Sequence, residues 1–392
     1  MTNVFVLAGQ RTAIGDYGKA LKDIAPTKLG EIAIRAALAK GGVDGGEVQA
    51  VVMGHVIQTE ARDVYLSRIC AVEAGIPVET PALTVNRLCG SGLQAIISAA
   101  QSIMLGDADI AVAGGAESMS RGGYMLPTER WGAGLGDSKV IDMVVGALHD
   151  PFGCGHMGIT AENVAARYQI SRAMQDEFAL ESHRRAVYAA AAGYFKEQIT
   201  PVEIVSRKAT VLFDADEHPR GDASLASLRS LKPAFKKDGT VTAGNASSLN
   251  DGAAALVLAS EIEVMRRGAT PLGRLVAYGH AGVDPAYMGL GPIPASQKAL
   301  KNAGLSIADM DVIEANEAFA SQACAVTREL KFDPEKVNPN GGAVALGHPV
   351  GASGAIIVVK ALYELQRIRG KYALVTMCIG GGQGIAAIFE RV

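Results

Sequence analysis

The chain has 392 residues, of which 49% are hydrophobic and 20% are charged, and this length predicts two or three domains. The formal net charge of -3 offers no broad basic face, so it argues against a nucleic-acid-binding protein. Five scattered cysteines without a CxxC pair argue against structural zinc and against a disulfide framework.

The first residues, MTNVFVLAGQRTAIG, predict a strand that runs into a loop and lack the charged leader and apolar core of a signal peptide. No apolar run reaches membrane-spanning length by inspection, and the closing IAAIFERV carries no peroxisomal or lipidation signal. We therefore expect a cytoplasmic protein that contacts neither a membrane nor a nucleic acid.

The next elements alternate between helix and strand. Residues 34–56 predict an amphipathic helix, a glycine turn and a buried strand. An apolar strand, PALTV, then leads through NRLCGSG to a helix opened by Ser91, and the strand DIAVAGGAE follows. Residues 119–249 interrupt the pattern with helices of their own, such as SRAMQDEFALESHRRAVYAAAAGYF, before the strand GAAALVLAS resumes it at Gly252.

The same order of elements returns in the last third of the chain. Residues 295–317 repeat the helix, turn and strand of residues 34–56, and Ser353-Gly354 is predicted to open a second long helix, AIIVVKALYELQRI. Three aligned pairs have nearly equal separations along the sequence: Val51 with Val312, Ser91 with Ser353, and Ile110 with Leu374. This agreement indicates an internal duplication.

The duplication predicts three parts: an N-terminal half (1–118 plus 250–271), an inserted domain (119–249) and a C-terminal half (272–392). Alternating strands and helices predict an α/β fold with a mixed, helix-covered sheet in each half. If the two halves pack face to face, a functional site belongs at the strand ends and helix N-termini where they meet.

Cys89 is the first candidate for chemistry, because it ends a strand and directly precedes a helix. Unpaired N–H groups and the positive dipole end there favour a thiolate. Gly90 and Gly92 allow a sharp turn and leave backbone donors near the sulfur, as an oxyanion hole requires. The alternative is a small buried cysteine with packing glycines, and the local sequence taken alone favours that alternative.

His348 lies in NPNGGAVALGHPVGASG, which by the repeat is the same connection in the second half as the turn of Cys89. A lone histidine is more often structural than catalytic, but this pseudo-symmetric placement favours a catalytic role. Cys378 ends a buried strand before three glycines; it is either an ordinary strand cysteine, which the local sequence favours, or a second reactive thiol. Asn316 also ends a strand, where its amide could cap the next helix or point into a cleft.

Four segments in order, NRLCGSG, NEAFA, GHPVGASG and CIGGGQG, resemble the four signature blocks of the thiolase superfamily. The likeness runs from RTAIG through GAESMS and GNASSLNDGAAA to the last strand. The segments HDPFGCGHMG, NRLCGSGLQ and CIGGGQGIAAIFE are most similar to biosynthetic acetyl-CoA acetyltransferases and to the broad-range β-ketothiolases of polyhydroxyalkanoate synthesis. The resemblance implies a duplicated thiolase fold, with βαβαβαββ-type halves forming a layered α-β-α-β-α core.

The resemblance also implies a mechanism. His348 would take the proton of Cys89, whose thiolate would attack an acyl-CoA and form an acyl-enzyme. Cys378 would remove the α-proton of acetyl-CoA, and the enolate would attack the acyl group to give a 3-ketoacyl-CoA. His348 and a water held by Asn316 would stabilise the enolate oxygen, and the N–H groups of Cys89 and Gly380 would bind the tetrahedral oxyanion. Coenzyme A is then a substrate and product, and neither a prosthetic group nor a metal is required.

By the same likeness, the inserted domain would hold CoA. The expected CoA contacts are Arg220, Ser227, Phe235, Ala243, Ser247 and Leu249. The expected lining of the acyl and pantetheine end is Leu148, His156, Met157, Met288, Ala318 and Phe319. Arg87 departs from the glutamine common in acetyl-specific relatives, which puts acetyl-only specificity in doubt.

Several rival functions differ at these positions. A 3-ketoacyl synthase shares the architecture but would carry histidine in place of Cys378. A thiolase-like CoA or lipid carrier should have lost Cys89, His348 or Cys378, whereas a redox-sensing dithiol would use the two cysteines. A degradative 3-ketoacyl-CoA thiolase stays open because the chemistry is reversible. The resemblance also implies a homotetramer, a dimer of dimers. The segment RGGYMLPTERWGAGLGDSK is either a loop that mediates such a contact or an ordinary surface loop.

Overall fold

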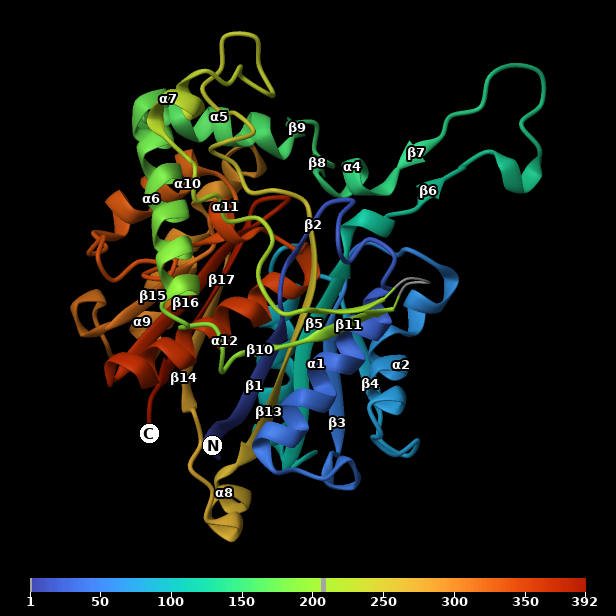
Figure 1. The fold of residues 1–392 in the computed structure, drawn as a ribbon, viewed down its shortest axis with the longest axis vertical. Helices are drawn as coiled ribbons and strands as arrows, with labels where there is room; N and C mark the ends of the chain where they lie inside the picture. The colour runs from blue at the N-terminus through green and yellow to red at the C-terminus, as the bar shows by residue number, and fades with distance from the viewer. Residues whose placement is uncertain (1, 206–208) are drawn as a thin grey trace.

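The protein is described by a computed structural model that covers residues 2–205 and 209–392 (Figure 1). One hydrogen-bonded path of strands, in the order β15-β16-β17-β14-β1-β13-β5-β3-β4, runs through the molecule. The strands of the path are β1 (Val4–Thr12), β3 (Ala50–Gly54), β4 (Ala82–Val85), β5 (Ile110–Ser118), β13 (Asn250–Ser260), β14 (Gly273–Gly282), β15 (Val312–Ala315), β16 (Tyr372–Ile379) and β17 (Gln383–Glu390).

The strand order repeats between the halves, as the duplication predicts. In the first half β3 pairs in parallel with β5, and β5 pairs antiparallel with β13; in the second, β15 pairs in parallel with β16, and β16 pairs antiparallel with β17. The halves meet where β1 and β14 pair antiparallel, with Val4 opposite Leu275. A register shift interrupts β1 between Val6 and Ala8, where β1 also pairs with β13.

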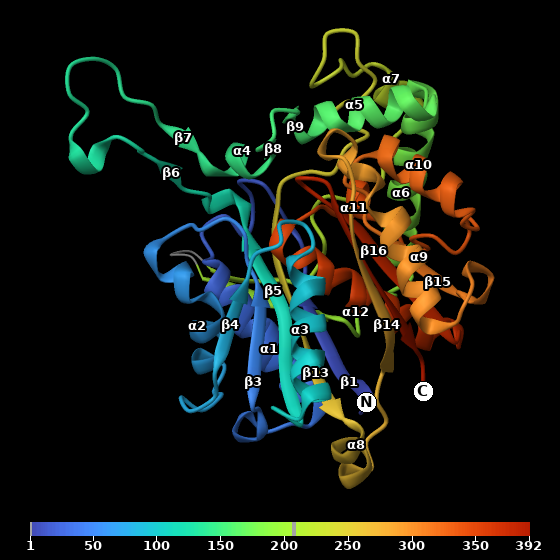
Figure 2. The same ribbon diagram turned by 180° about the vertical axis from the view of Figure 1, so that it is seen from behind.

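Helices form three layers around these strands, which confirms the α-β-α-β-α arrangement (Figures 1 and 2). Helices α1 (Pro26–Gly41) and α2 (Leu66–Glu73) pack on the outer face of the first half. Helices α9 (Pro292–Ala303) and α10 (Ala320–Leu330) cover the second half in the same way. Helices α3 (Ser91–Leu105) and α12 (Val350–Ile368) lie between the halves and share the largest core cluster.

Helices α3 and α12 approach closely because glycines face each other at their first turns. A Cβ on Gly92 would lie 2.6 Å from the Ala355 nitrogen, and one on Gly354 would lie 2.3 Å from the Leu93 nitrogen. The predicted start of α3 at Ser91 is confirmed, but α12 begins at Val350, three residues before the predicted Ser353.

Residues 88–105 correct one expectation, because this stretch is long and apolar enough to cross a membrane. Helix α3 occupies most of it, and its apolar residues pack against α12 in the core between the halves. A helix buried on several sides is apolar around most of its circumference. The core position therefore accounts for its composition.

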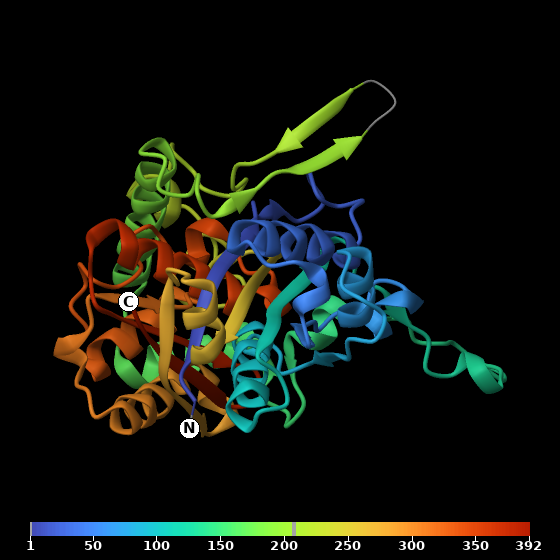
Figure 3. The same cartoon turned by 90° about the horizontal axis from the view of Figure 1, so that it is seen from below.

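The segment between β5 and β13 carries helices α4 (Met143–Ala147), α5 (Met157–Tyr168), α6 (Arg172–Ala191) and α7 (Leu225–Arg229). Helices α5, α6 and α7 gather over one end of the second half, while β6 (Tyr124–Met125) and β7 (Ile141–Asp142) lead into an arm that extends away from the body (Figure 1). The hairpin of β11 (Val202–Val205) and β12 (Thr210–Phe213) runs along the outside of α1 (Figure 3). The limits 119–249 stay a prediction.

The remaining elements are short. They are strands β2 (Gly15–Asp16), β8 (His149–Asp150), β9 (Gly155–His156) and β10 (Ile199–Thr200), and helices α8 (Glu261–Arg267) and α11 (Ala343–Leu346). Strands β8 and β9 form a small hairpin that leads directly into α5. Helix α11 directly precedes the turn that carries His348.

Candidate active site

Cys89 lies in a tight turn between β4 and α3. The preceding residue, Leu88, has φ 46°, a left-handed conformation that a branched side chain seldom adopts without support. Ser91 provides this support, because its Oγ accepts a 2.8 Å hydrogen bond from the Arg87 N–H and donates a 2.7 Å bond to the Leu88 carbonyl. The turn therefore holds the sulfur beyond the strand end at the start of α3.

Burial opposes the thiolate that the helix end was expected to favour at Cys89. Burial raises the pKa of Cys89 to about 11, although a backbone hydrogen bond from Gly380 and one from Cys89 itself lower it. Loss of hydration thus outweighs the helix end in the free protein. The side chain is still partly accessible, and a nucleophilic role requires a base that removes its proton.

His348 has one ring nitrogen engaged and the other free. Its backbone N–H donates to Asn250 Oδ1 at 2.8 Å, and its Nδ1 lies 2.6 Å from Ser353 Oγ. The Ser353 hydroxyl donates its own hydrogen to the Pro349 carbonyl at 2.9 Å, so it accepts from Nδ1–H. This assignment leaves a lone pair on Nε2, which is buried and has no partner among the described residues.

Burial also keeps the imidazole of His348 neutral, since it lowers the pKa of this group to about 4. A neutral imidazole with a free Nε2 can accept a proton. Val350, two residues after His348, packs in the same apolar cluster as Cys89. The two turns of the duplicated halves therefore face a common space.

Cys378 lies at the end of β16 and is buried. Burial raises the pKa of its thiol, and the charge of an ionised Cys89 raises it further, which places the two sulfur groups within electrostatic reach. Both cysteines are free thiols in the structure. Gly380 and its N–H follow two residues later, in contact with Leu88 of the Cys89 turn.

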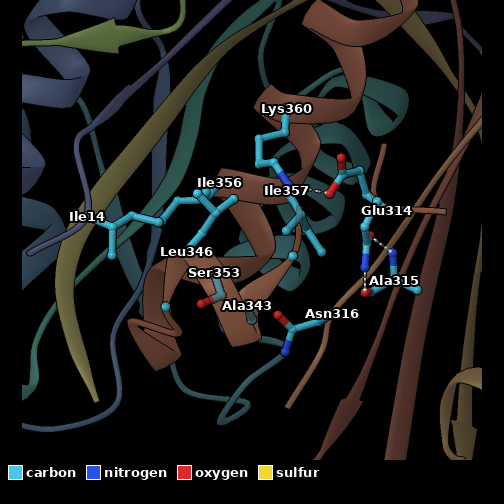
Figure 4. Close-up of a pocket in the computed structure, with 13 residues that line it drawn as sticks. Ile14, Glu314, Ala315, Asn316, Ala343, Leu346, Ser353, Ile356, Ile357 and Lys360 are labelled. Atoms are coloured by element: carbon cyan, nitrogen blue, oxygen red, sulfur yellow. Dashed lines mark hydrogen bonds and ion pairs between the residues drawn. The ribbon is translucent and has the colours of Figure 1, made fainter. Parts of the chain in front are cut away.

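Asn316 does not cap a helix, so the capping interpretation is wrong: α10 begins at Ala320 with Phe319 as its N-cap. The buried Nδ2 of Asn316 has no partner among the described residues. Asn316 and Ser353 line one small cavity of about 20 Å³, which is enough for a single water molecule (Figure 4). At the other end of this cavity Lys360 Nζ lies 2.8 Å from Glu314 Oε2.

The predicted substrate and CoA contacts fall into three groups. The apolar cluster that contains Cys378 includes Met157, Phe235, Met288, Ala318 and Phe319. The cluster that contains Cys89 includes Leu148 and Leu249. A separate cavity of about 160 Å³ is lined by Arg220, Ser227 and Ala243.

The last two predicted contacts join the cluster of Cys378. The ring of His156 stacks on Phe235 with 4.7 Å between centroids, and Ser247 donates from both its N–H and its Oγ to the Ala318 carbonyl at 3.0 Å. The structure thus gathers the predicted residues around the two thiols and one separate cavity, and their individual roles stay predictions.

Comparison with known proteins agrees with this geometry. A family model described as "Thiolase, N-terminal domain" matches residues 4–262, and one described as "Thiolase, C-terminal domain" matches residues 269–391. The chain belongs to the thiolase family. It is 63% identical to the beta-ketothiolase BktB of Cupriavidus necator over 99% of each chain, and 49% identical to an acetyl-CoA acetyltransferase of the same organism over 100% of each chain.

A crystal structure of human mitochondrial 3-ketoacyl-CoA thiolase in complex with CoA superposes on this thiolase with a TM-score of 0.97. The two are 48% identical, and the alignment covers 100% of this chain and 98% of that one. The predicted thiolase fold is therefore confirmed.

Sequence reasoning missed three polar residues that hold the turns of this thiolase. Asn250 and Ser353 orient His348, as described above. Glu117 is fully buried at the end of β5, where its carboxylate accepts from the N–H groups of Val56, Ile57 and Gly351 at 3.1, 3.1 and 2.8 Å. The only indication of Glu117 in the sequence was a carboxylate inside the apolar strand of GAESMS. Within the described parts of the chain, no group of three His, Cys, Asp or Glu residues could hold a metal.

Proposed function

We propose that this thiolase catalyses the reversible condensation of acetyl-CoA with an acyl-CoA to give a 3-ketoacyl-CoA and free CoA. The observation that carries the proposal is that the turns of Cys89 and His348 meet in one apolar cluster, through Cys89 and Val350. Cys89, with a pKa of about 11, needs its proton removed, and His348, with a pKa of about 4 and a free Nε2, can accept it.

In the first step, the proton of Cys89 passes to His348 Nε2 while the sulfur attacks the thioester carbonyl. The Gly380 N–H, already directed at Cys89, donates to the developing oxyanion. Collapse of the tetrahedral intermediate breaks the bond to the CoA sulfur, which takes the proton from His348 and leaves as CoA. The acyl group then remains on Cys89.

In the second step, Cys378 gives its proton to His348 Nε2, and the resulting thiolate removes the α-proton of acetyl-CoA. The enolate oxygen is stabilised by the Nδ2 of Asn316 through a water in the small cavity beside it, and by His348. The enolate carbon attacks the acyl carbonyl, the bond to Cys89 breaks, and its sulfur leaves as a thiolate. His348 returns its proton to Cys89 and Cys378 keeps the α-proton, which restores the free enzyme.

The thiolysis of two ketoacyl substrates tests this function and its range. Acetoacetyl-CoA and 3-ketovaleryl-CoA should be cleaved at comparable rates, because the acyl end is lined by side chains without a charge, such as Met157, Met288 and Phe319. Loss of the longer substrate alone would instead indicate an acetyl-specific enzyme. If Cys89→Ala kept full turnover, the assignment of the nucleophile would be wrong, and if wild type bound CoA without turnover, the protein would be a carrier.

Assembly and location extend the proposal. The arm between β6 and β7 exposes Tyr124, Leu126, Trp131 and Leu135, a set of large apolar side chains suited to a contact between subunits. A homotetramer that assembles through this arm would cover these side chains. We also expect the protein to be located in the cytoplasm. Sedimentation of Trp131→Ser beside wild type would test this, since a tetramer held by the arm should dissociate.

A further inference from the structure

Arg87 connects the Cys89 turn to the second half of the molecule. Its Nη1 donates to Gln94 Oε1 in α3 at 2.5 Å, while its Nε and Nη2 donate to Gln383 Oε1 at 3.3 and 3.2 Å. Gln94 belongs to the same half as Cys89, whereas Gln383 is the first residue of β17. One guanidinium therefore holds an amide from each half.

Gln383 lies beside the second thiol. In the hairpin of β16 and β17 it is opposite Ile379, and the next pair along the strands is Cys378 with Gly384. Its backbone is held in place by a close crossing, since a Cβ on Gly291 would lie 2.0 Å from the Gln383 carbonyl oxygen. A bond to Gln383 is thus a bond to a fixed point next to Cys378.

The Cys89 turn and this hairpin also touch directly. A Cβ on Gly90 would lie 2.5 Å from Ile379 Cδ1, and one on Gly380 would lie 3.1 Å from Leu88 Cδ1. Steric contacts of this kind prevent closer approach but do not prevent separation or sliding. The directional hydrogen bonds of Arg87 supply the missing restraint.

Removing the guanidinium of Arg87 from water costs free energy that its neutral partners do not fully offset. It is half-buried, burial lowers its pKa, and no carboxylate among the described residues forms an ion pair with it. A charged group held only by amides contributes less to stability than one with a carboxylate. Its place between the Cys89 turn and the Cys378 hairpin is better explained by the geometry that it imposes.

We propose that Arg87 is a positioning residue that fixes the Cys89 turn against the Cys378 hairpin. The inference rests on the proposed function, in which only carbon–carbon bond formation and cleavage need both thiols. Acyl transfer between CoA and Cys89 needs Cys89 and His348 but not Cys378. Loosening the contact should therefore slow thiolysis far more than it slows the exchange of labelled CoA with acetyl-CoA.

The test compares these two rates in the full-length enzyme. Arg87→Met should lower kcat for thiolysis of acetoacetyl-CoA about tenfold and leave CoA exchange within about twofold of wild type. Gln383→Met should give the same split, and the double variant should lose no more than either single variant, because one shared contact is removed. Arg87→Lys should recover only part of the rate, since an ammonium cannot hold both amides in the same geometry.

Arg274→Met is the matched control. Arg274 also links distant parts of the sheet, by bonds to Asn3 and Glu390, but it lies away from both thiols. It should change neither rate by more than about twofold. A uniform loss of exchange and thiolysis in Arg87→Met, or additive losses in the double variant, would overturn the inference. Absence of exchange in wild type, or its persistence in Cys89→Ala, would overturn the proposed function instead.

Discussion

The turns of Cys89 and His348 occupy equivalent places in the duplicated halves, and each contains a serine at the same position of the repeat. In the first half, Ser91 bonds only to the backbone, to the Arg87 N–H and the Leu88 carbonyl. In the second half, Ser353 accepts from the ring of His348 and leaves Nε2 free. A serine at the same position of the repeat thus supports a strained turn in one half and orients the ring of His348 in the other.

The two turns also differ in the sign of the pKa shift that burial causes. The acid Cys89 has its pKa raised to about 11, and the base His348 has its pKa lowered to about 4. Both changes favour the neutral form, so the resting pair carries no charge. The comparison indicates that duplication supplied two similar turns, one of which carries the proposed nucleophile and the other the proposed base.

Removing either reactive group should have the largest effect. Cys89→Ala removes the acyl acceptor, and His348→Asn removes the base while keeping a polar side chain, so each should lower kcat for thiolysis by at least about 10³-fold. Steady-state kinetics on both ketoacyl substrates measures this. Unfolding midpoints should be recorded beside them, and His348→Asn with full activity would contradict the assigned base.

The two equivalent serines should give opposite outcomes. Ser353→Ala releases the His348 ring and should lower kcat about 10²-fold with little change in stability. Ser91→Ala leaves the Arg87 N–H without a partner and should lower the free energy of unfolding by about 1–2 kcal/mol. Its effect on kcat should be smaller. Chemical denaturation measures the free energy of unfolding of both variants, and steady-state kinetics measures their kcat. Equal losses of kcat would show that the two serines have the same role.

The pH dependence of alkylation tests the resting state of the pair. With a Cys89 pKa of about 11, the thiolate fraction and the rate of reaction with iodoacetamide should rise about tenfold per pH unit from pH 7 to 9. The alkylation of Cys89→Ala measures the contribution of the other thiols, which is subtracted from the rate of wild type. A plateau below pH 8 would show that the helix N-terminus or an ion pair with His348 holds a thiolate.

The neutral state of His348 also links stability to pH. Its folded pKa of about 4 lies below the ordinary value of 6.5, so the folded protein resists a proton that the unfolded chain binds. This contribution is present in full above pH 6.5 and is lost as the pH falls toward 4. His348→Asn should lose stability less steeply than wild type across this window.

Elements with strong local signals were predictable from the sequence. The start of α3 at Ser91 follows from a glycine-rich turn before a long apolar run, and the equal spacing of three aligned pairs indicated the duplication. The start of α12 was placed too late because Pro349 ends the turn as the N-cap and lets the helix begin at once. A sequence pattern predicts the presence of a helix or strand well, and its first residue less well.

The site was only partly predictable, because protonation and orientation depend on residues far apart in the sequence. Burial opposes the thiolate expected at Cys89, and it was not predictable because the helix end is a local feature whereas burial by the second half is not. The contact of Asn250 with the His348 N–H joins residues 98 positions apart, and no local pattern announces it. Resemblance to a family supplied the candidate reactive residues, and the structure was needed to show which residues hold them.

A cationic contact remote from both turns should change binding and leave their chemistry intact. Arg220 is exposed and lines the cavity shared with Ser227 and Ala243. Arg220→Met should raise KM for CoA about three- to tenfold, leave kcat unchanged, and weaken the dependence of KM on salt, because a phosphate contact is lost. Arg229→Met is the control, since Arg229 is equally exposed on α7 but lies outside that lining. A fall in kcat for Arg220→Met would mean that the cavity and the two turns are coupled.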